Sequence, residues 1–204
     1  MIKNIVFDMA EVMLLNDPAD YISTLDIDHS KDEMLRNAAL DIDFFADIDQ
    51  GRMQDMAAGI EEYKKRYPDI SSELDAYVAG PWREGVFLAM PGMPELVERL
   101  KEKGFGVYLL TNFGKTDMDF VRRTHHFEEL FDGVLVSAEE GVWKPDPAFY
   151  RLLTERFGID LTESVFADDN PANVRAAEEL GMTGIVFKGR EAFLQELSKY
   201  IGEI

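Results

Sequence analysis

Short apolar runs alternate with amphipathic helical segments from about residue 105 onward, and this alternation constrains the fold more than any other feature of the chain. Four of these runs predict strands, at residues 105–110, 133–137, 164–167 and 184–187. A fifth strand is predicted at residues 2–7, close to the amino terminus. Strands separated by helices favour right-handed crossovers and a parallel sheet that is covered on both faces. We therefore predict an α/β fold with a doubly wound, Rossmann-like parallel sheet.

The segments between these strands carry recognisable helix signals. Asp146 followed by Pro147 predicts an N-cap and a proline in the first helical turn, and Gly158 ends that helix. A second helix begins at Asn170 or Pro171 and is closed by Gly181. Two further helices are expected at the remaining positions of the alternation, at residues 94–103 and 190–200.

The pattern differs between the first strand and Pro91. Amphipathic helical stretches occur there, including residues 31–40 and 53–67, and none of the intervening segments predicts a strand convincingly. We interpret residues 17–85 as a helical cap domain that is inserted after the first strand. Residues 1–16 and 86–204 then form the α/β core domain.

Composition limits the function classes that fit this chain. The 21 basic and 40 acidic residues give a net charge of −19, which argues against nucleic acid as a partner because phosphate backbones require a basic surface. The chain has no cysteine, so disulfides and thiolate zinc sites are excluded. No apolar run reaches membrane-spanning length, and the first strand leaves no room for a signal peptide. We expect a cytoplasmic protein that associates with neither membranes nor nucleic acid. We make no prediction of its oligomeric state.

Polar residues follow the predicted strands at the points where these strands end. Asp8 follows the first strand, Thr111 and Asn112 follow the second, and Asp168 and Asp169 follow the fourth. Parallel sheets of this kind bind ligands at the carboxyl ends of their strands. Adjacent carboxylates repel one another unless a cation compensates, so this pair favours a metal site.

Each of these polar residues also has a simpler structural interpretation. Thr111 and Asn112 alone would be read as a turn, and Asn170 alone as an N-cap. Lys144, in the loop before the Asp146 helix, would be read as a solvated surface lysine. Their occurrence together in one alternating frame favours a functional site.

This combination resembles the haloacid dehalogenase superfamily of phosphotransfer hydrolases over essentially the whole chain. The matching segments are VFDMAEVM, LLTNFG, WKPDPAFY and VFADDNPANVRAAEELGM, and the last two are long and specific. The insert, with its FFADIDQGRM segment, is similar to the small helical cap of subfamily IA. The first motif resembles the aspartate-x-glycine type, which includes sugar-phosphate phosphatases.

The resemblance implies a magnesium-dependent phosphatase that acts on a small phosphorylated metabolite. In this reading Asp8 is the nucleophile and forms an aspartyl-phosphate. The implied Mg²⁺ ligands are Asp8, the backbone carbonyl of Ala10 and Asp168, while Asp169 acts through a metal-bound water or orients Lys144. The expected phosphate contacts are the Thr111 hydroxyl, the Asn112 backbone amide and the Lys144 ammonium group. Asn173 is expected either to support the site residues or to serve helix packing, and we favour packing.

Ala10 departs from the pattern of most phosphatases in this superfamily, which carry a second aspartate there. That aspartate protonates the leaving oxygen and later activates water, a role worth about 10²–10⁴-fold in rate. Alanine offers the metal its backbone carbonyl but supplies no proton. Sugar 1-phosphates and acyl phosphates fit such a site, since their leaving groups need less help. Glu11 follows where a small residue is usual, and we expect its side chain to face solvent rather than replace the missing acid.

Two other functions remain open at this point. Alanine at position 10 also resembles the phosphonate-cleaving branch of the superfamily, which uses a Schiff-base lysine from the cap, and the insert contains Lys31, Lys64 and Lys65. Alternatively, the protein is a regulatory module that keeps the metal and phosphate site without turnover. Dehalogenation fits least, because it needs no magnesium. The candidate substrate contacts in the cap are Phe44, Phe45, Arg52 and Trp82. Each of these residues could instead belong to the core of the cap itself.

Overall fold

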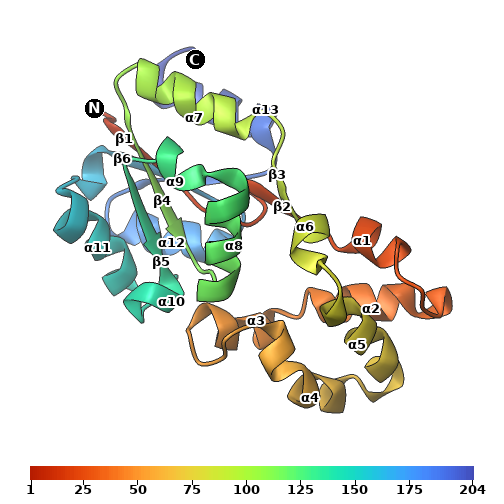
Figure 1. The fold of residues 1–204 in the computed structure, drawn as a ribbon. Helices are drawn as coiled ribbons and strands as arrows, with labels where there is room; N and C mark the ends of the chain where they lie inside the picture. The colour runs from red at the N-terminus through yellow and green to blue at the C-terminus, as the bar shows by residue number, and fades with distance from the viewer.

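The computed structural model describes the backbone of residues 1–204 and every side chain except those of Ile42 and Glu128. The described backbone contains a five-stranded parallel sheet in the order β5-β4-β1-β6-β7 (Figure 1). The strands are β1 (Asn4–Phe7), β4 (Gly106–Thr111), β5 (Gly133–Val136), β6 (Ser164–Asp168) and β7 (Thr183–Val186). All five predicted strands are confirmed to within two residues, and so is the α/β class.

Helices cover both faces of this sheet. Successive side chains of a strand point to opposite faces, so each strand contributes to the apolar packing on both sides. Ile5 and Phe7 of β1 belong to one apolar cluster, which includes α7 (Met93–Glu102) and α13 (Arg190–Ile201). Val6 between them belongs to a second cluster with α11 (Pro147–Phe157) and α12 (Pro171–Glu179). Figure 1 shows α7 and α13 on one side of the sheet and α11 on the other. The central strand is thus buried on both faces.

The helix signals read from the sequence are also confirmed. Asp146 accepts a hydrogen bond from the Ala148 amide at 2.8 Å, and Gly158 ends α11 in the left-handed conformation with φ +71°. Asn170 caps α12 through the Ala172 amide at 2.9 Å. Shorter helices complete the core between the strands: α8 (Lys115–His125), α9 (Phe127–Leu130), α10 (Ser137–Glu140) and the 3₁₀ turn Leu161–Glu163.

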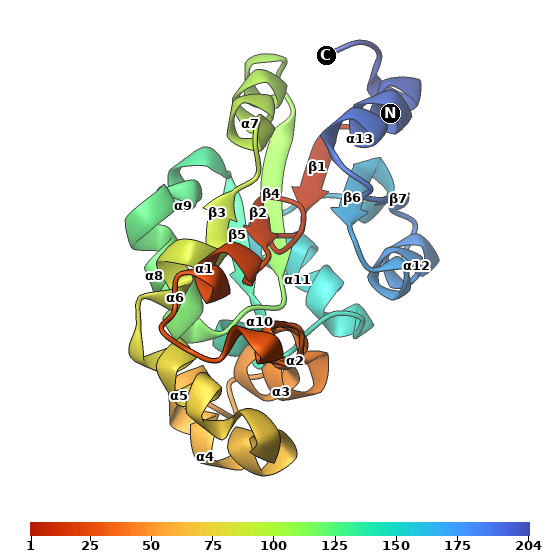
Figure 2. The same cartoon turned by 90° about the vertical axis from the view of Figure 1, so that its right-hand side faces the viewer.

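The insert enters and leaves through a two-stranded antiparallel ribbon that the sequence analysis did not predict. It pairs β2 (Leu14–Asn16) with β3 (Phe87–Ala89). Between them the described backbone is helical: α1 (Ala19–Ser23), the 3₁₀ turn His29–Lys31, α2 (Asp32–Ala39), α3 (Ile42–Asp49), α4 (Met56–Arg66), the 3₁₀ turn Pro68–Ile70, α5 (Ser71–Ala79) and α6 (Trp82–Val86). Figure 2 shows these helices gathered below the core.

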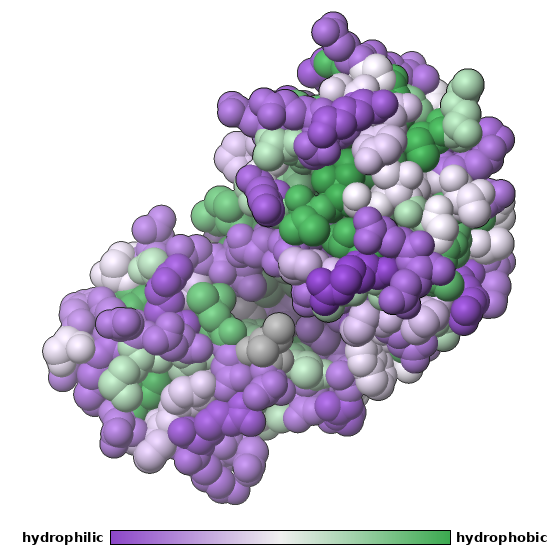
Figure 3. Space-filling model, turned by 180° about the vertical axis from the view of Figure 1, so that it is seen from behind, coloured by the Kyte–Doolittle hydropathy of each residue, from purple (hydrophilic) through white to green (hydrophobic). Residues whose placement is uncertain are grey.

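The insert has apolar packing of its own. Phe44 of α3 stacks on Tyr63 of α4 with ring centroids 3.8 Å apart, and Trp82 stacks on Tyr77 at 5.9 Å. Asp41 ties the two ends of the α3–α4 pair together: it caps α3 and accepts hydrogen bonds from Arg66 and Tyr67, both at 2.7 Å. The molecule has two lobes, and the face shown in Figure 3 is mostly hydrophilic, with an apolar patch on the upper lobe. Across the described residues, no helix has the length and apolar character needed to cross a bilayer.

Candidate active site

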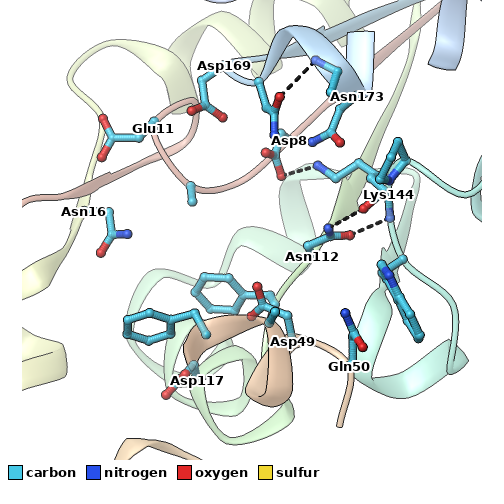
Figure 4. Close-up of a pocket in the computed structure, with 18 of the residues that line it drawn as sticks. Asp8, Glu11, Asn16, Asp49, Gln50, Asn112, Asp117, Lys144, Asp169 and Asn173 are labelled. Carbon is cyan, nitrogen blue, oxygen red and sulfur yellow. Dashed lines mark hydrogen bonds and ion pairs between the residues drawn. The ribbon is translucent and has the colours of Figure 1, made fainter. Parts of the chain in front are cut away.

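The carboxyl ends of β1, β4 and β6 bring the predicted polar residues to one edge of the sheet. Parallel register aligns Phe7 with Leu109 on one side and with Ala167 on the other, so the residues that follow these strands are neighbours in space. Asp8 follows β1, Asn112 follows β4, and β6 ends at Asp168. Lys144 comes from the loop between α10 and α11 and lies among them (Figure 4).

The Lys144 ammonium group lies between two carboxylates. Its Nζ is 2.7 Å from Asp8 Oδ1 and 2.7 Å from Asp168 Oδ2, and all three side chains are nearly inaccessible to solvent. Burial lowers the pKa of Lys144, but the charges of Asp168 and Asp8 outweigh it and the net shift is upward, so the lysine stays protonated. Burial raises the pKa of Asp8, while Lys144 opposes that shift. Lys144 is therefore a buried cation held by two carboxylates, and not the solvated surface lysine of the simpler interpretation.

Asp168 is held by a set of donors as well as by the lysine. Its Oδ1 accepts the Asn170 amide at 2.8 Å, and the Asn173 side-chain amide lies 3.1 Å from both of its carboxylate oxygens. Of the two roles expected for Asn173, these contacts favour support of the site over helix packing, which we had preferred. This side chain projects from the first turn of α12 and fixes the orientation of Asp168.

Three carboxylates at this edge are arranged to hold a divalent cation. One oxygen each of Asp8, Asp168 and Asp169 lies within 4.8 Å of the others. Oxygen ligands of this kind, with open positions left for water, fit Mg²⁺. Ala10 lines the same cavity, as its predicted role requires. Of the two roles left open for Asp169, direct orientation of Lys144 finds no support, because the lysine hydrogen-bonds to Asp168 instead.

The two residues at the end of β4 occupy different environments. The Thr111 hydroxyl is fully buried, and no hydrogen-bond partner for it occurs among the described residues. A buried hydroxyl without a partner is unfavourable, so this atom is open to an additional acceptor. The Asn112 side chain bonds both backbone groups of Lys144: its Nδ2 donates to the carbonyl at 2.9 Å and its Oδ1 accepts the amide at 2.8 Å. Asn112 thus positions the lysine loop.

Most of these residues form one wall of a cavity of about 480 Å³ between the core and the cap, whereas Thr111 and Asp168 are not among its described lining residues. From the core, Asp8, Asn112, Lys144 and Asp169 face into it (Figure 4). Apolar side chains form much of the remaining wall: Leu40, Phe45, Ala46, Phe87, Phe113 and Trp143. Of the cap residues proposed from the sequence, Phe45 lines this cavity, Phe44 and Trp82 are buried in the packing of the insert, and Arg52 pairs with Asp47 on the surface.

The cavity also contains carboxylates that the sequence analysis did not assign to the site. Asp49 comes from the last residue of α3, and Asp117 comes from the first turn of α8. Burial raises the pKa of Asp49 to about 7, Asp117 adds to the shift and Lys144 opposes it. Neither residue follows a strand or stands in a motif that indicates a site. The FFADIDQGRM segment, which contains Asp49, was the single signal that could have drawn attention to it.

Glu11 both meets and departs from expectation. Its residue is exposed, as predicted, yet its side chain lines the cavity beside Asp169 (Figure 4). Partial burial raises its pKa, and the charge of Asp169 adds to that shift. Its backbone has φ +58°, a left-handed conformation that glycine adopts at much lower cost. This backbone conformation explains why a small residue such as glycine is expected at position 11.

The cavity wall has an excess of negative charge. Five carboxylates line it, namely Asp8, Glu11, Asp49, Asp117 and Asp169, whereas Lys144 is the one cationic residue in the described lining. An anionic ligand would be repelled from such a site unless a metal ion compensated, since charges interact strongly where water is excluded. The donor set and the charge balance both fit a divalent cation.

The cap lysines lie away from this cavity. Lys31 pairs with Glu73 at 2.9 Å, Lys65 pairs with Glu62 at 2.7 Å, and Lys64 pairs with Glu61 and Asp75. None of the three is among the described cavity-lining residues. A Schiff-base lysine must be desolvated and must face the substrate, so the arrangement gives the phosphonate-cleaving alternative no support.

Comparison with known proteins agrees with this geometry. A family model described as haloacid dehalogenase-like hydrolase matches residues 2–181. A sesquiterpene phosphatase from Aspergillus oryzae is 36% identical over 110 residues, which cover 54% of this chain and 56% of that protein. A phosphoserine phosphatase from Thermus thermophilus is 31% identical over 137 residues, covering 66% of this chain and 46% of its own length. The matches thus span about half of these curated relatives.

Solved structures share the fold. A predicted HAD-like family hydrolase from Porphyromonas gingivalis aligns over the full length of both chains with a TM-score of 0.69 and 22% identity. A HAD family enzyme from Bacteroides thetaiotaomicron, solved in complex with magnesium and inorganic phosphate, aligns over 93% of this chain and 96% of its own with a TM-score of 0.66 and 22% identity. At these identities the likeness concerns the fold alone.

Proposed function

The chain belongs to the haloacid dehalogenase-like hydrolase family, and from this premise we propose that it is a magnesium-dependent phosphatase of a small phosphorylated metabolite. One observation carries the proposal: Lys144 Nζ lies 2.7 Å from both Asp8 and Asp168, at the edge of a cavity where Asp169 completes a carboxylate cluster. Relatives named as phosphatases and a structural neighbour solved with magnesium and phosphate support it.

Asp8 is the nucleophile in this proposal. Its carboxylate oxygen attacks phosphorus, the bond to the leaving oxygen breaks, and the phosphoryl group is carried as an aspartyl-phosphate until water releases it. Lys144 reaches Asp8 directly and stabilises the negative charge that develops during the transfer. When bound, Mg²⁺ would neutralise the phosphate and fix its position, held by Asp8, Asp168, the Ala10 carbonyl and Asp169.

The phosphate contacts follow from the residues at the end of β4. The unpartnered Thr111 hydroxyl is suited to donate to a phosphoryl oxygen, with the Asn112 amide next to it. The side chain of Asn112 also keeps Lys144 in place. Holding the ester in line with Asp8 lowers the barrier, because orientation is fixed before the reaction begins.

The cavity wall points to the chemistry of the substrate's organic part. The aspartate-x-glycine resemblance favours a sugar phosphate, whereas the aromatic rings of Phe45, Phe87, Phe113 and Trp143 favour an ester with an apolar or flat face. A panel of sugar phosphates, phosphoserine, flavin mononucleotide and prenyl phosphates distinguishes these classes. A regulatory protein without turnover would hydrolyse none of them.

The decisive experiment measures p-nitrophenyl phosphate hydrolysis with and without Mg²⁺. We expect activity that requires the metal and that falls by at least about 10³-fold in Asp8→Asn, since the amide cannot form the covalent intermediate. Asp26→Asn, at an exposed position outside the cavity, serves as the matched control and retains activity. Hydrolysis that persists in Asp8→Asn, or no hydrolysis of any ester in the panel, would contradict the proposal.

A further inference from the structure

The proposed reaction leaves one requirement that the core does not meet. The leaving oxygen must take up a proton, and Ala10 supplies none. In an in-line displacement the leaving group departs on the side of phosphorus opposite the nucleophile. A proton donor for it is therefore best placed across the cavity from Asp8, on the side that the cap covers.

Asp49 occupies that side of the cavity. It is the last residue of α3 and lines the cavity from the cap, whereas Asp8 lines it from the core. Figure 4 shows Asp49 below Asp8, with Asn112 at an intermediate level. None of the described side chains hydrogen-bonds to the Asp49 carboxyl; the one side chain that hydrogen-bonds to this residue, Ser137, contacts its backbone carbonyl. The carboxyl group is thus available to a ligand.

The C-terminal end of α3 contacts the core directly, and this contact determines the position of Asp49. The Ser137 hydroxyl donates to the Asp49 carbonyl and accepts the Phe113 amide at 3.0 Å. A Cβ added to Gly51 would lie 3.3 Å from the Ala138 carbonyl oxygen. The turn after α3 is therefore in close contact with α10, and this backbone contact does not depend on the Asp49 side chain.

The surroundings of Asp49 leave a large share of its carboxyl groups protonated near neutral pH. Burial raises its pKa to about 7, Asp117 of α8 adds to the shift, and Lys144 opposes it. The other charged groups on α10 are occupied, since Glu139 pairs with Arg122 and Glu140 pairs with Arg156. The carboxylates of Glu11 and Asp169 line the same cavity from the core.

The other cavity carboxylates fit this role less well. Burial raises the pKa of Asp117 and Arg83 opposes that shift, but the Arg83 guanidinium group lies 2.6 Å from the Asp117 carboxylate and already occupies it. Glu11 lies beside Asp169, on the side of the nucleophile, where an in-line leaving oxygen does not pass (Figure 4). Asp8 and Asp169 belong to the proposed nucleophile and metal cluster.

We propose that Asp49 of the cap is the general acid and base of this enzyme, in place of the aspartate missing at position 10; this inference rests on the proposed phosphatase function. In the first step Asp8 bonds to phosphorus while the ester bond breaks, and the leaving oxygen takes the Asp49 proton. In the second step the Asp49 carboxylate removes a proton from water, whose oxygen attacks the aspartyl-phosphate. Phosphate leaves, and both Asp8 and protonated Asp49 are restored.

The test compares two nearly isosteric esters, p-nitrophenyl phosphate and phenyl phosphate, in Asp49→Asn. The phenolate of the second ester is a poorer leaving group and needs the proton. We expect kcat/KM for phenyl phosphate to fall about 10²–10⁴-fold, and that for p-nitrophenyl phosphate to fall far less. With p-nitrophenyl phosphate the variant should release one equivalent of nitrophenolate in a burst, because dephosphorylation then limits turnover.

The pH profile supplies a second readout. The wild-type kcat/KM for phenyl phosphate should decline above pH about 7, where Asp49 loses its proton, and this limb should be absent in Asp49→Asn. Asp47→Asn is the matched control, on the same helix but outside the cavity, and should leave both esters unaffected.

Equal losses for the two esters without a burst would show that Asp49 acts only through structure and would overturn the inference. An unchanged rate for phenyl phosphate would do the same. If the wild type hydrolyses neither these two esters nor any ester of the metabolite panel in the presence of Mg²⁺, the phosphatase function itself fails, and the inference fails with it.

Discussion

At the scale of single residues, the proposed reaction depends on Ala10, which cannot donate a proton to the leaving oxygen, and on Asp49, which donates it instead. An aspartate at position 10 would place a carboxyl two residues from Asp8, in the wall of the same cavity. We expect Ala10→Asp to raise kcat/KM for phenyl phosphate only a few-fold in the wild type, where Asp49 already supplies the proton. In the Asp49→Asn background it should restore the rate by at least about tenfold.

Steady-state kinetics of the four variants check this prediction as a double-mutant cycle. Ala10→Asn is the control, since it adds a side chain of the same size without an acidic proton. An equal effect of Ala10→Asp in both backgrounds would mean that the two carboxylates do not share a role.

Residues at the ends of strands were the part of the site that sequence reasoning could reach. Asp8 and Asn112 follow buried strands and Asp168 ends one, and a parallel sheet brings such positions together whatever the details of packing. Asn173 was misjudged, because its contact with Asp168 depends on how the first turn of α12 is oriented. Asp49 was missed for a similar reason: a carboxylate at a helix end acquires a role only through tertiary contact with the core.

At the scale of secondary-structure elements, the contact between α3 and the core determines whether the cavity is complete. Gly114, immediately before α8, faces Ile48 of α3, and a Cβ at position 114 would collide with Ile48 Cγ2. Its φ of −69° suits any residue, so a substitution there acts through the space around the new Cβ, where Ile48 is the closest neighbour and Asp117 Oδ2 lies 3.3 Å away. We predict that Gly114→Ala makes the active position of α3 about 1–3 kcal/mol less favourable than a displaced position, which lowers kcat/KM by about 5- to 150-fold.

Kinetics of Gly114→Ala should be measured together with thermal unfolding. The melting temperature should change little, because a shift of α3 relieves the collision without unfolding either lobe. In an Ile48→Ala background the same substitution should have little further effect on kcat/KM, since the colliding methyl group is gone. A large fall in melting temperature with unchanged kinetics would contradict this assignment.

The elements themselves were predictable to different degrees. The five strands and the helices α7, α11, α12 and α13 have strong periodic or capping signals, and all were predicted. The β2–β3 ribbon was not, because three residues per strand are too few to show an alternation, and its pairing joins positions about 70 residues apart. The boundary we assign between core and cap, residues 17–85, stays a prediction of the sequence.

At the scale of the whole molecule, the net charge of −19 and the carboxylates around the cavity make the protein responsive to cations. Specific binding of Mg²⁺ to the folded state would stabilise it by about 2.7 kcal/mol at 100 times Kd. For a chain of this size that corresponds to a rise in melting temperature of about 5–10 °C. Phosphate should add a further rise only when Mg²⁺ is present, because the cavity alone repels anions.

Thermal unfolding with Mg²⁺ and phosphate, singly and together, checks this prediction, and the control must separate binding from screening. Any salt reduces the mutual repulsion of so many acidic groups, so a rise in melting temperature alone proves little. Asp169→Asn keeps almost the whole surface charge but removes one carboxylate of the cluster. Screening would act on it as on the wild type. If Mg²⁺ binds at the cluster, the variant should lose most of the Mg²⁺-dependent rise in melting temperature and the phosphate response that follows it. Equal rises in melting temperature in both proteins would exclude the cluster as the binding site.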